Sequence, residues 1–168
     1  MTIVSTSPDT GAVPEPAEPI RVASERVLIV EDDSAARVGL EQLVKSWGFV
    51  ADSAQDGEEA LEKVTTFRPA IVITDLVMPR MDGLGLLRAL QQQGAEATTV
   101  LLTAQGTVET AVEAMKEGAY DYLTKPVEIQ RLKIMLDKIV ERLETQREVK
   151  ALRRQLSEHG TFGSIIGR

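Results

Sequence analysis

Apolar and polar residues follow one another along the chain in blocks that predict strands and helices in turn. Short apolar runs rich in Val and Ile, each ending in polar residues, are typical of strands buried on both faces of a parallel sheet. Such runs cover residues 27–30, 49–54, 70–75, 98–103 and 120–124. Between them, helical spacing of apolar residues covers 34–46, 56–66, 84–93 and 108–117, and a last helix is expected over 127–157. This order predicts an α/β fold, a (βα)5 chain in which right-handed crossovers build a doubly wound parallel sheet of five strands.

The blocks also divide the chain into regions. Residues 1–24 are rich in Pro, Ser, Thr, Glu and Ala and show no apolar period, so they predict a disordered N-terminal tail. We expect one folded domain over 25–140, followed by a helical linker over 141–160.

Composition removes several classes of function. The chain has no Cys and one His, His159, so thiolate sites, disulfides and histidine metal sites are excluded. The net charge of -7 argues against direct nucleic-acid binding, which needs clustered Lys and Arg. No apolar run approaches the roughly 20 residues that span a bilayer, and the N-terminus lacks a signal-peptide pattern, so we expect no membrane contact and a cytoplasmic location.

Five chemically active residues stand where the predicted strands end. Asp32 and Asp33 follow the first strand, Asp75 and Thr103 end the third and fourth, and Lys125 follows the fifth. In doubly wound sheets the working site lies at the carboxyl ends of the strands. Each residue alone has an ordinary structural explanation, since Asp33 could simply cap the next helix. Their joint placement favours a common site.

The residue types in this set suit magnesium-dependent phosphoryl chemistry. Three carboxylates at neighbouring strand ends repel one another unless a hard cation such as Mg2+ lies between them. Asp75 can then attack phosphorus as a nucleophile. Lys125 adds a positive charge, and the Thr103 hydroxyl can donate to a phosphoryl oxygen.

Residues 26 to about 140 resemble the receiver domain of two-component response regulators. The stretches that carry the resemblance are VLIVEDD (27–33), IVITDLVMPRMDG (71–83), VLLTAQG (100–106) and GAYDYLTKP (118–126). The resemblance implies a flavodoxin-like fold with strand order 2-1-3-4-5.

The resemblance also implies roles for the metal and phosphoacceptor residues. Asp75 would accept a phosphoryl group from a phosphohistidine of a cognate sensor histidine kinase. Asp32 and Asp33 would bind Mg2+ together with Asp75, and the backbone carbonyl of Val77 would be a further ligand.

A second group of residues would respond to the phosphoryl group. Thr103 would move toward it, Lys125 would pair with it, and Tyr122 would be the aromatic switch that turns inward. The bond between Lys125 and Pro126 would be cis, a form that is affordable only before proline. The chain would be a signalling domain that phosphorylates and dephosphorylates itself, not an enzyme acting on other substrates.

The last predicted helix is longer than a receiver needs, roughly 45 Å at 1.5 Å per residue. Its apolar residues keep a spacing of three and four, with a phase shift at Gln146, which is typical of a two-stranded coiled coil with a stutter. The alternative is an amphipathic helix packed on its own domain. We expect a homodimer through a seam formed by Leu132, Leu136, Ile139, Leu143, Val149 and Leu152.

Residues 161–168, TFGSIIGR, resemble the opening of the AAA+ domain of sigma-54-dependent activators of the nitrogen-regulatory (NtrC) type. That resemblance implies a chain truncated before the AAA+ domain, with sigma-54 RNA polymerase and DNA as partners of the full-length protein. No Walker A motif is present, so the chain itself should not hydrolyse ATP.

Three alternatives stay open. The receiver could serve a different output domain, or it could be a pseudo-receiver, although the complete acid-Thr-Lys set argues against that. The chain could also be a magnesium-dependent phosphatase of the haloacid-dehalogenase kind. That class places a second Asp two residues after its nucleophile, where this chain has Val77.

Overall fold

The computed structural model describes residues 25–104 and 108–158. The chain forms two compact units that divide after Pro126. The first contains these elements in order: β3 (Arg26–Val30), α2 (Ser34–Ser46), β4 (Val50–Ala54), α3 (Gly57–Phe67), β5 (Ile71–Asp75), α4 (Gly83–Gln92), β6 (Thr98–Thr103), α5 (Val108–Lys116) and β7 (Asp121–Thr124). The second contains α6 (Ile129–Glu158).

The five strands form one parallel sheet in the order β4-β3-β5-β6-β7. This is the predicted order 2-1-3-4-5, which is confirmed. The central strands are largely apolar, and no side chain from Val27 to Val30 is exposed. A strand covered on both faces carries its first polar residues only where it leaves the sheet. The sheet therefore gathers its polar strand ends at one edge.

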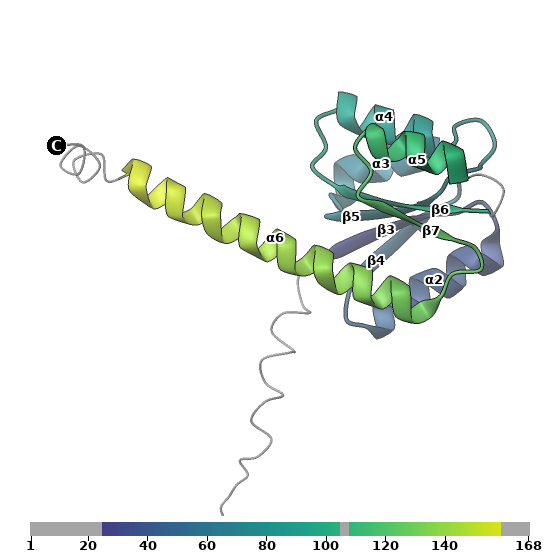
Figure 1. Ribbon diagram of the computed structural model, residues 1–168, viewed down its shortest axis with the longest axis horizontal. Coiled ribbons are helices and arrows are strands. Elements are labelled where there is room, and N and C mark those ends of the chain that lie inside the picture. The colour runs from purple at the N-terminus through teal and green to yellow at the C-terminus, as the bar shows by residue number, and fades with distance from the viewer. Residues whose placement is uncertain (1–24, 105–107, 159–168) are drawn as a thin grey trace, which may run out of the picture. The chain divides into compact units, whose positions relative to one another are not determined.

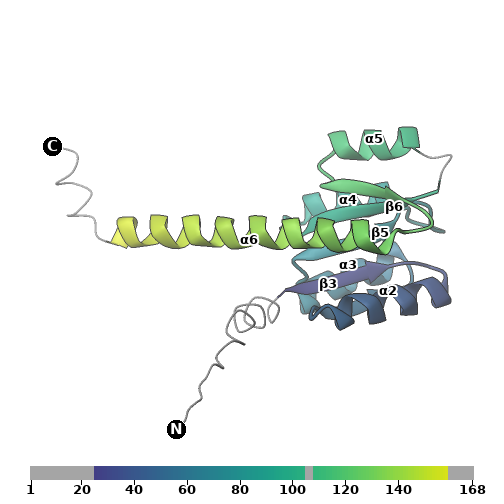
Figure 2. The same cartoon turned by 60° about the horizontal axis from the view of Figure 1, so that its bottom comes forward.

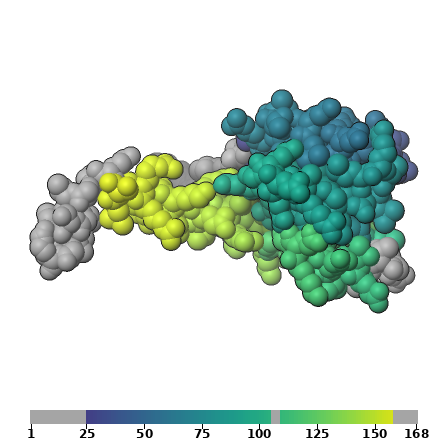
Figure 3. All heavy atoms as spheres, turned by 90° about the horizontal axis from the view of Figure 1, so that it is seen from above, coloured from purple at the N-terminus to yellow at the C-terminus, as the bar shows by residue number. Residues whose placement is uncertain are grey.

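Helices cover both faces of the sheet, with α3, α4 and α5 on one side and α2 on the other (Figure 1). Figure 2 shows the strands between α5 and α2 from a second direction. The outer layer is seen from outside in Figure 3, where α3, α4 and α5 lie side by side in blue, teal and green. Beneath this layer lie two buried apolar clusters, one around Val72 and Leu86 and the other around Leu101 and Leu84.

An aspartate caps each of the first three helices. Asp33 accepts a hydrogen bond from the Ala36 N–H, Asp56 from the Glu59 N–H and Asp82 from the Gly85 N–H, each at 2.8 Å. An N-cap side chain of this kind satisfies one of the amides that a helix start leaves unpaired. These caps fix where the helices begin, directly after the loops that leave the strand ends.

Helix α6 has 30 residues, and its apolar side chains change character along its length. Leu132, Leu136 and Ile139 are fully buried, whereas Val149 and Leu152 are 39% and 59% exposed. Of the residues predicted for a dimer seam, Leu132, Leu136 and Ile139 are thus buried and Leu143 is half-buried, and pairing with a second copy stays a prediction. Among the described residues, no helix is both long and apolar enough to cross a membrane.

The observed elements follow the predicted ones to within about two residues, and 34–46 and 98–103 agree at both ends. The division after Pro126 falls earlier than the expected domain boundary at 140. Residues 1–24, Gln105 and residues 159–168, with His159 and the expected AAA+ beginning, lie outside the described residues.

Candidate functional site

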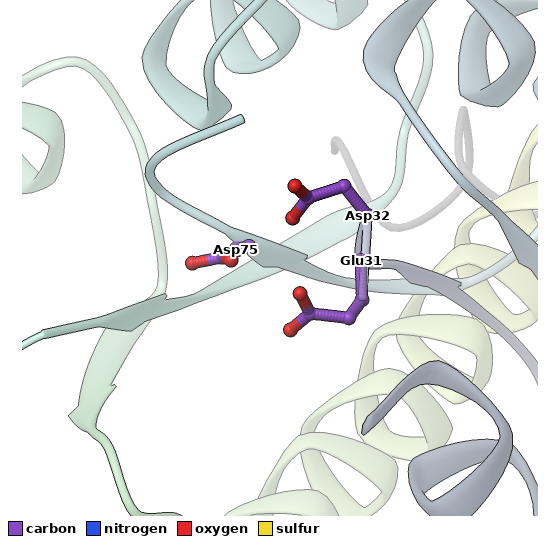
Figure 4. Close-up of side chains that lie close together, drawn as sticks. All are labelled: Glu31, Asp32 and Asp75. Atoms are coloured by element: carbon purple, nitrogen blue, oxygen red, sulfur yellow. The ribbon is translucent and has the colours of Figure 1, made fainter. Parts of the chain in front are cut away.

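Three carboxylates meet where β3 and β5 end. Glu31 directly follows β3 and extends its pairing, because its N–H donates to the Ala54 carbonyl at 3.1 Å. Asp75 is the last residue of β5, and Asp32 stands one residue beyond Glu31. Each of Glu31, Asp32 and Asp75 offers an oxygen, and these oxygens lie within 4.8 Å of one another (Figure 4). Glu31 and Asp75 are buried, whereas Asp32 is exposed.

The structure does not bring Asp33 into this cluster. Its carboxylate accepts from the Ala36 N–H at 2.8 Å and caps α2. Because the Asp33 carboxylate caps α2, it is directed to the first turn of that helix and not to the carboxylates at the strand end. Glu31, which the sequence prediction left out, takes the second place in the acidic pair. The prediction that paired Asp32 with Asp33 is corrected to Glu31 with Asp32.

Lys125 joins two of these carboxylates. Its ammonium Nζ donates to Asp75 Oδ2 at 2.9 Å and to Glu31 Oε1 at 3.0 Å. The following peptide bond, between Lys125 and Pro126, is cis, as predicted. The Lys125 N–H donates to the Thr103 carbonyl at 2.8 Å, which ties this segment to the end of β6. The predicted proximity of Lys125 to Asp75 is therefore present in the structure.

Burial and hydrogen bonding shift the pKa values of two residues of this site, Glu31 and Lys125. Burial raises the pKa of Glu31 above its usual range, and the hydrogen bond from Lys125 offsets only part of that effect. Partial burial works to lower the pKa of Lys125, but the hydrogen bonds to Asp75 and Glu31 outweigh it, so the pKa is raised. Lys125 therefore stays protonated at neutral pH and balances part of the negative charge.

Thr103 and Tyr122 lie on the two strands beyond Asp75. Thr103 ends β6 one residue after Leu102, the partner of Asp75 in the sheet. Its side chain is fully buried, and its hydroxyl donates to the Ala104 carbonyl at 3.1 Å. Tyr122 is partly buried against the apolar cluster that contains Leu101. Thr103 and Tyr122 thus lie on the neighbouring strands β6 and β7, and their role as a switch stays a prediction.

The loop from β5 to α4 is tight. The Gly83 N–H donates to the Leu76 carbonyl at 2.7 Å, and a Cβ atom at Gly83 would lie 2.6 Å from the Asp75 carbonyl oxygen. Only glycine fits so close to backbone. The Met78 side chain is buried, whereas that of Val77 is 60% exposed, so Val77 lies on the outer side of the loop. A role for its carbonyl in binding metal stays a prediction.

The residues present fit a hard divalent cation. Carboxylate oxygens from Glu31, Asp32 and Asp75 are the ligand type that Mg2+ prefers. Two of the three are buried, and buried carboxylates are expensive unless paired or bound to metal. Lys125 balances one negative charge, which leaves an excess for the cation.

Fold and site together define a receiver, and comparison with known proteins agrees. Residues 27–137 match the response regulator receiver domain family, and the chain belongs to that family. It is a receiver domain of two-component signalling.

Among the relatives, regulatory protein AtoC of Escherichia coli is 32% identical over 144 residues, which is 86% of this chain and 31% of AtoC. Response regulator MprA of Mycolicibacterium vanbaalenii is 39% identical over 107 residues, 64% of this chain and 46% of MprA. The crystal structure of NtrX from Brucella abortus in complex with ATP has a TM-score of 0.71 at 31% identity and covers 76% of this chain and 29% of NtrX. The chain thus spans less than half of the length of these curated relatives, 31% of AtoC and 46% of MprA.

Proposed function

We propose that Asp75 accepts a phosphoryl group from a phosphohistidine of a sensor kinase, in a Mg2+ site formed with Glu31 and Asp32. The observation that carries this proposal is the meeting of three carboxylates within 4.8 Å at the end of β3 and β5, with Lys125 bonded to two of them. Membership of the receiver family supports the same reading.

The chemistry is one in-line displacement. A carboxylate oxygen of Asp75 attacks phosphorus, the bond from phosphorus to the imidazole nitrogen breaks, and the imidazole leaves with the electron pair. Bound Mg2+ would neutralise charge on the phosphoryl oxygens. Lys125 leaves its hydrogen bond to Asp75 and pairs with a phosphoryl oxygen, while Glu31 keeps it in place.

The new charge then changes the face of the domain that carries Thr103 and Tyr122. Phosphorylation adds nearly two negative charges and three acceptor oxygens. The Thr103 hydroxyl leaves the Ala104 carbonyl for one of these oxygens, and Tyr122 moves into the space this opens. This is a local charge change that biases an element with two arrangements.

For the output we propose an activator of the sigma-54-dependent type with an AAA+ domain after α6. Because 144 of the 168 residues align with AtoC, that match cannot end before residue 144, so it reaches into α6 beyond the receiver family match. NtrX, a structural neighbour, was crystallised with ATP. The half-exposed apolar residues of α6 suit pairing with a second copy, from Leu143 through Val149 and Leu152.

Phosphoryl transfer can be tested with Mg2+ and acetyl phosphate, followed by intact mass spectrometry. The proposal predicts one added phosphoryl group, which is lost on Asp75→Asn and requires Mg2+. Asp33→Asn and Asp82→Asn are matched controls, because both residues are exposed helix caps, and both variants should be labelled like the wild type. Labelling that survives Asp75→Asn, or continuous release of phosphate from unrelated phosphoesters, would contradict the proposal.

A further inference from the structure

The loop that follows Asp75 is joined to a distant turn by two neighbouring contacts. Arg80 of this loop forms an ion pair with Asp56, the cap of α3. Beside it, Met81 lies against Gly57, so closely that a Cβ atom at Gly57 would be 2.7 Å from Met81 Sδ. Two consecutive residues of the β5–α4 loop thus meet two consecutive residues at the start of α3.

Asp56, the partner of Arg80 in this ion pair, is held in one place by its surroundings. Only 6% of the residue is exposed, and its Oδ1 accepts from the Glu59 N–H at 2.8 Å. The hydrogen bond from Glu59, aided by Arg80, lowers the pKa of Asp56 despite burial. The carboxylate is therefore charged and held in one orientation by the helix that it caps.

Arg80 carries the strained part of the loop. Its φ is +70°, in the left-handed region that residues other than glycine seldom adopt, and its side chain is 63% exposed. With so much of the side chain in solvent, apolar burial offers little to hold it there. The ion pair with Asp56, beside the contact of Met81 with Gly57, ties this backbone conformation to the start of α3.

Arg80 lies in the same loop as Val77, whose carbonyl is a predicted Mg2+ ligand. The loop leaves β5 at Asp75, passes through the exposed Val77 and the buried Met78, and reaches Arg80 before α4 begins at Gly83. The buried Met78 and the contacts of Arg80 and Met81 thus hold the part of the loop that directly follows Val77.

We propose that Arg80 is a positioning residue that acts through Asp56 to hold the β5–α4 loop in the geometry that binds Mg2+. This inference rests on the proposed function, since it concerns the same metal site. Arg80 does not touch the reacting atoms, but it helps to set the affinity for Mg2+.

If Arg80 acted only through its charge, its removal would change the Mg2+ affinity in the opposite direction. Removing the positive charge of Arg80 makes the acidic edge more negative, and by Coulomb attraction alone Mg2+ would bind more tightly. Loss of a positioning contact misplaces a ligand and weakens binding instead. The direction of the change in Mg2+ affinity therefore separates positioning from a general charge effect.

The test is a titration of the full chain with MgCl2 in which binding is measured by NMR or isothermal calorimetry. Arg80→Ala should raise the Mg2+ dissociation constant about tenfold, the lower end of the range for supporting contacts around a metal. The matched control is Arg88→Ala, which removes the same charge from an exposed ion pair with Glu117 and should leave the constant within about twofold of wild type. An unchanged or lower constant in Arg80→Ala would overturn the inference.

A second pair of variants tests the route through Asp56. Asp56→Ser keeps a capping side chain but removes the partner of Arg80, and should weaken Mg2+ binding about as much as Arg80→Ala. In the Asp56→Ser background, adding Arg80→Ala should then have no further effect. A full additional loss in the double variant would show that Asp56 is not the route. If the wild type itself binds no Mg2+, the proposed function fails, which is a different result from an unchanged constant in Arg80→Ala alone.

Discussion

Strand β3 and helix α6 both contain a regular series of aliphatic residues, but the chain covers them differently. In β3 every side chain from Val27 to Val30 is fully buried. In α6 Leu132 and Ile139 are equally buried, whereas Leu152 and Leu156 are 59% and 53% exposed. Within one chain, the whole apolar series of β3 is therefore buried, but only the first part of the series in α6 is. The remaining apolar residues of α6 are exposed, and the proposed pairing with a second copy would cover them.

The largest effect is expected from a cavity in the sheet. Ile73→Ala in β5 removes a fully buried side chain, and we expect the free energy of unfolding to fall by about 4 kcal/mol. Leu152→Ala, at 59% exposure, should change it by no more than about 0.5 kcal/mol at concentrations where the chain is monomeric. Urea unfolding followed by circular dichroism measures both. Equal losses would mean that the contrast between the two regions is wrong.

A smaller effect is expected for self-association through α6. Leu152→Asp places a charge in the proposed seam and should weaken the dimer by about 2 kcal/mol, roughly thirtyfold in the dissociation constant. Ala151→Asp introduces the same charge at the neighbouring exposed position, next to the seam and not in it. Sedimentation should show a clear loss of dimer in the first variant and little in the second. A wild-type chain that stays monomeric at all accessible concentrations would remove the seam from the account.

The smallest effect concerns the charge of Asp56. The hydrogen bond from Glu59, and after it Arg80, lowers its pKa, so ionised Asp56 stabilises the folded state above its unfolded pKa. That contribution is lost as the pH falls below about 3.9 and through the lower folded value. Because Arg80 is exposed, we expect Asp56→Asn, which keeps a cap, to cost only about 0.5–1 kcal/mol at pH 7.

Urea unfolding of wild type and Asp56→Asn at a series of pH values tests whether this contribution to stability is lost as the pH falls. The two stabilities should converge as the pH falls, because wild-type Asp56 then becomes protonated. Asp33→Asn, the same change at the exposed cap of α2, is the control for a cap substitution that leaves the ion pair between Asp56 and Arg80 in place. A gap that widens as the pH falls would contradict the account.

Hydrophobic patterning was sufficient for the fold because buried parallel strands and covering helices have different periods. The strand ends also predicted that Asp75 and Lys125 would lie together, since parallel strands bring their carboxyl ends to one edge. What the pattern could not resolve was the side-chain direction within Glu31-Asp32-Asp33. Three consecutive acids look alike in sequence, and the cap of α2 decides that Asp33 turns away.

A local signal for that choice was present. The residue directly before a helix that starts at Ser34 is the N-cap, a place where Asp is favoured, which leaves Glu31 and Asp32 for the site. The link between Arg80 and Asp56 had no such signal, because the two residues are 24 positions apart and meet only through the fold. The burial of Leu132, Leu136 and Ile139 was equally hidden, since a seam residue and a core residue share the same spacing.

The central claim is that Glu31, Asp32 and Asp75 form one metal site from which Asp33 is excluded. The most direct measurement compares the Mg2+ affinities of Asp32→Asn and Asp33→Asn, neighbouring variants with the same change in charge. The account predicts that Asp32→Asn raises the dissociation constant by roughly 10- to 100-fold, whereas Asp33→Asn stays within about twofold of wild type. A large loss in Asp33→Asn, or wild-type binding in Asp32→Asn, would contradict it.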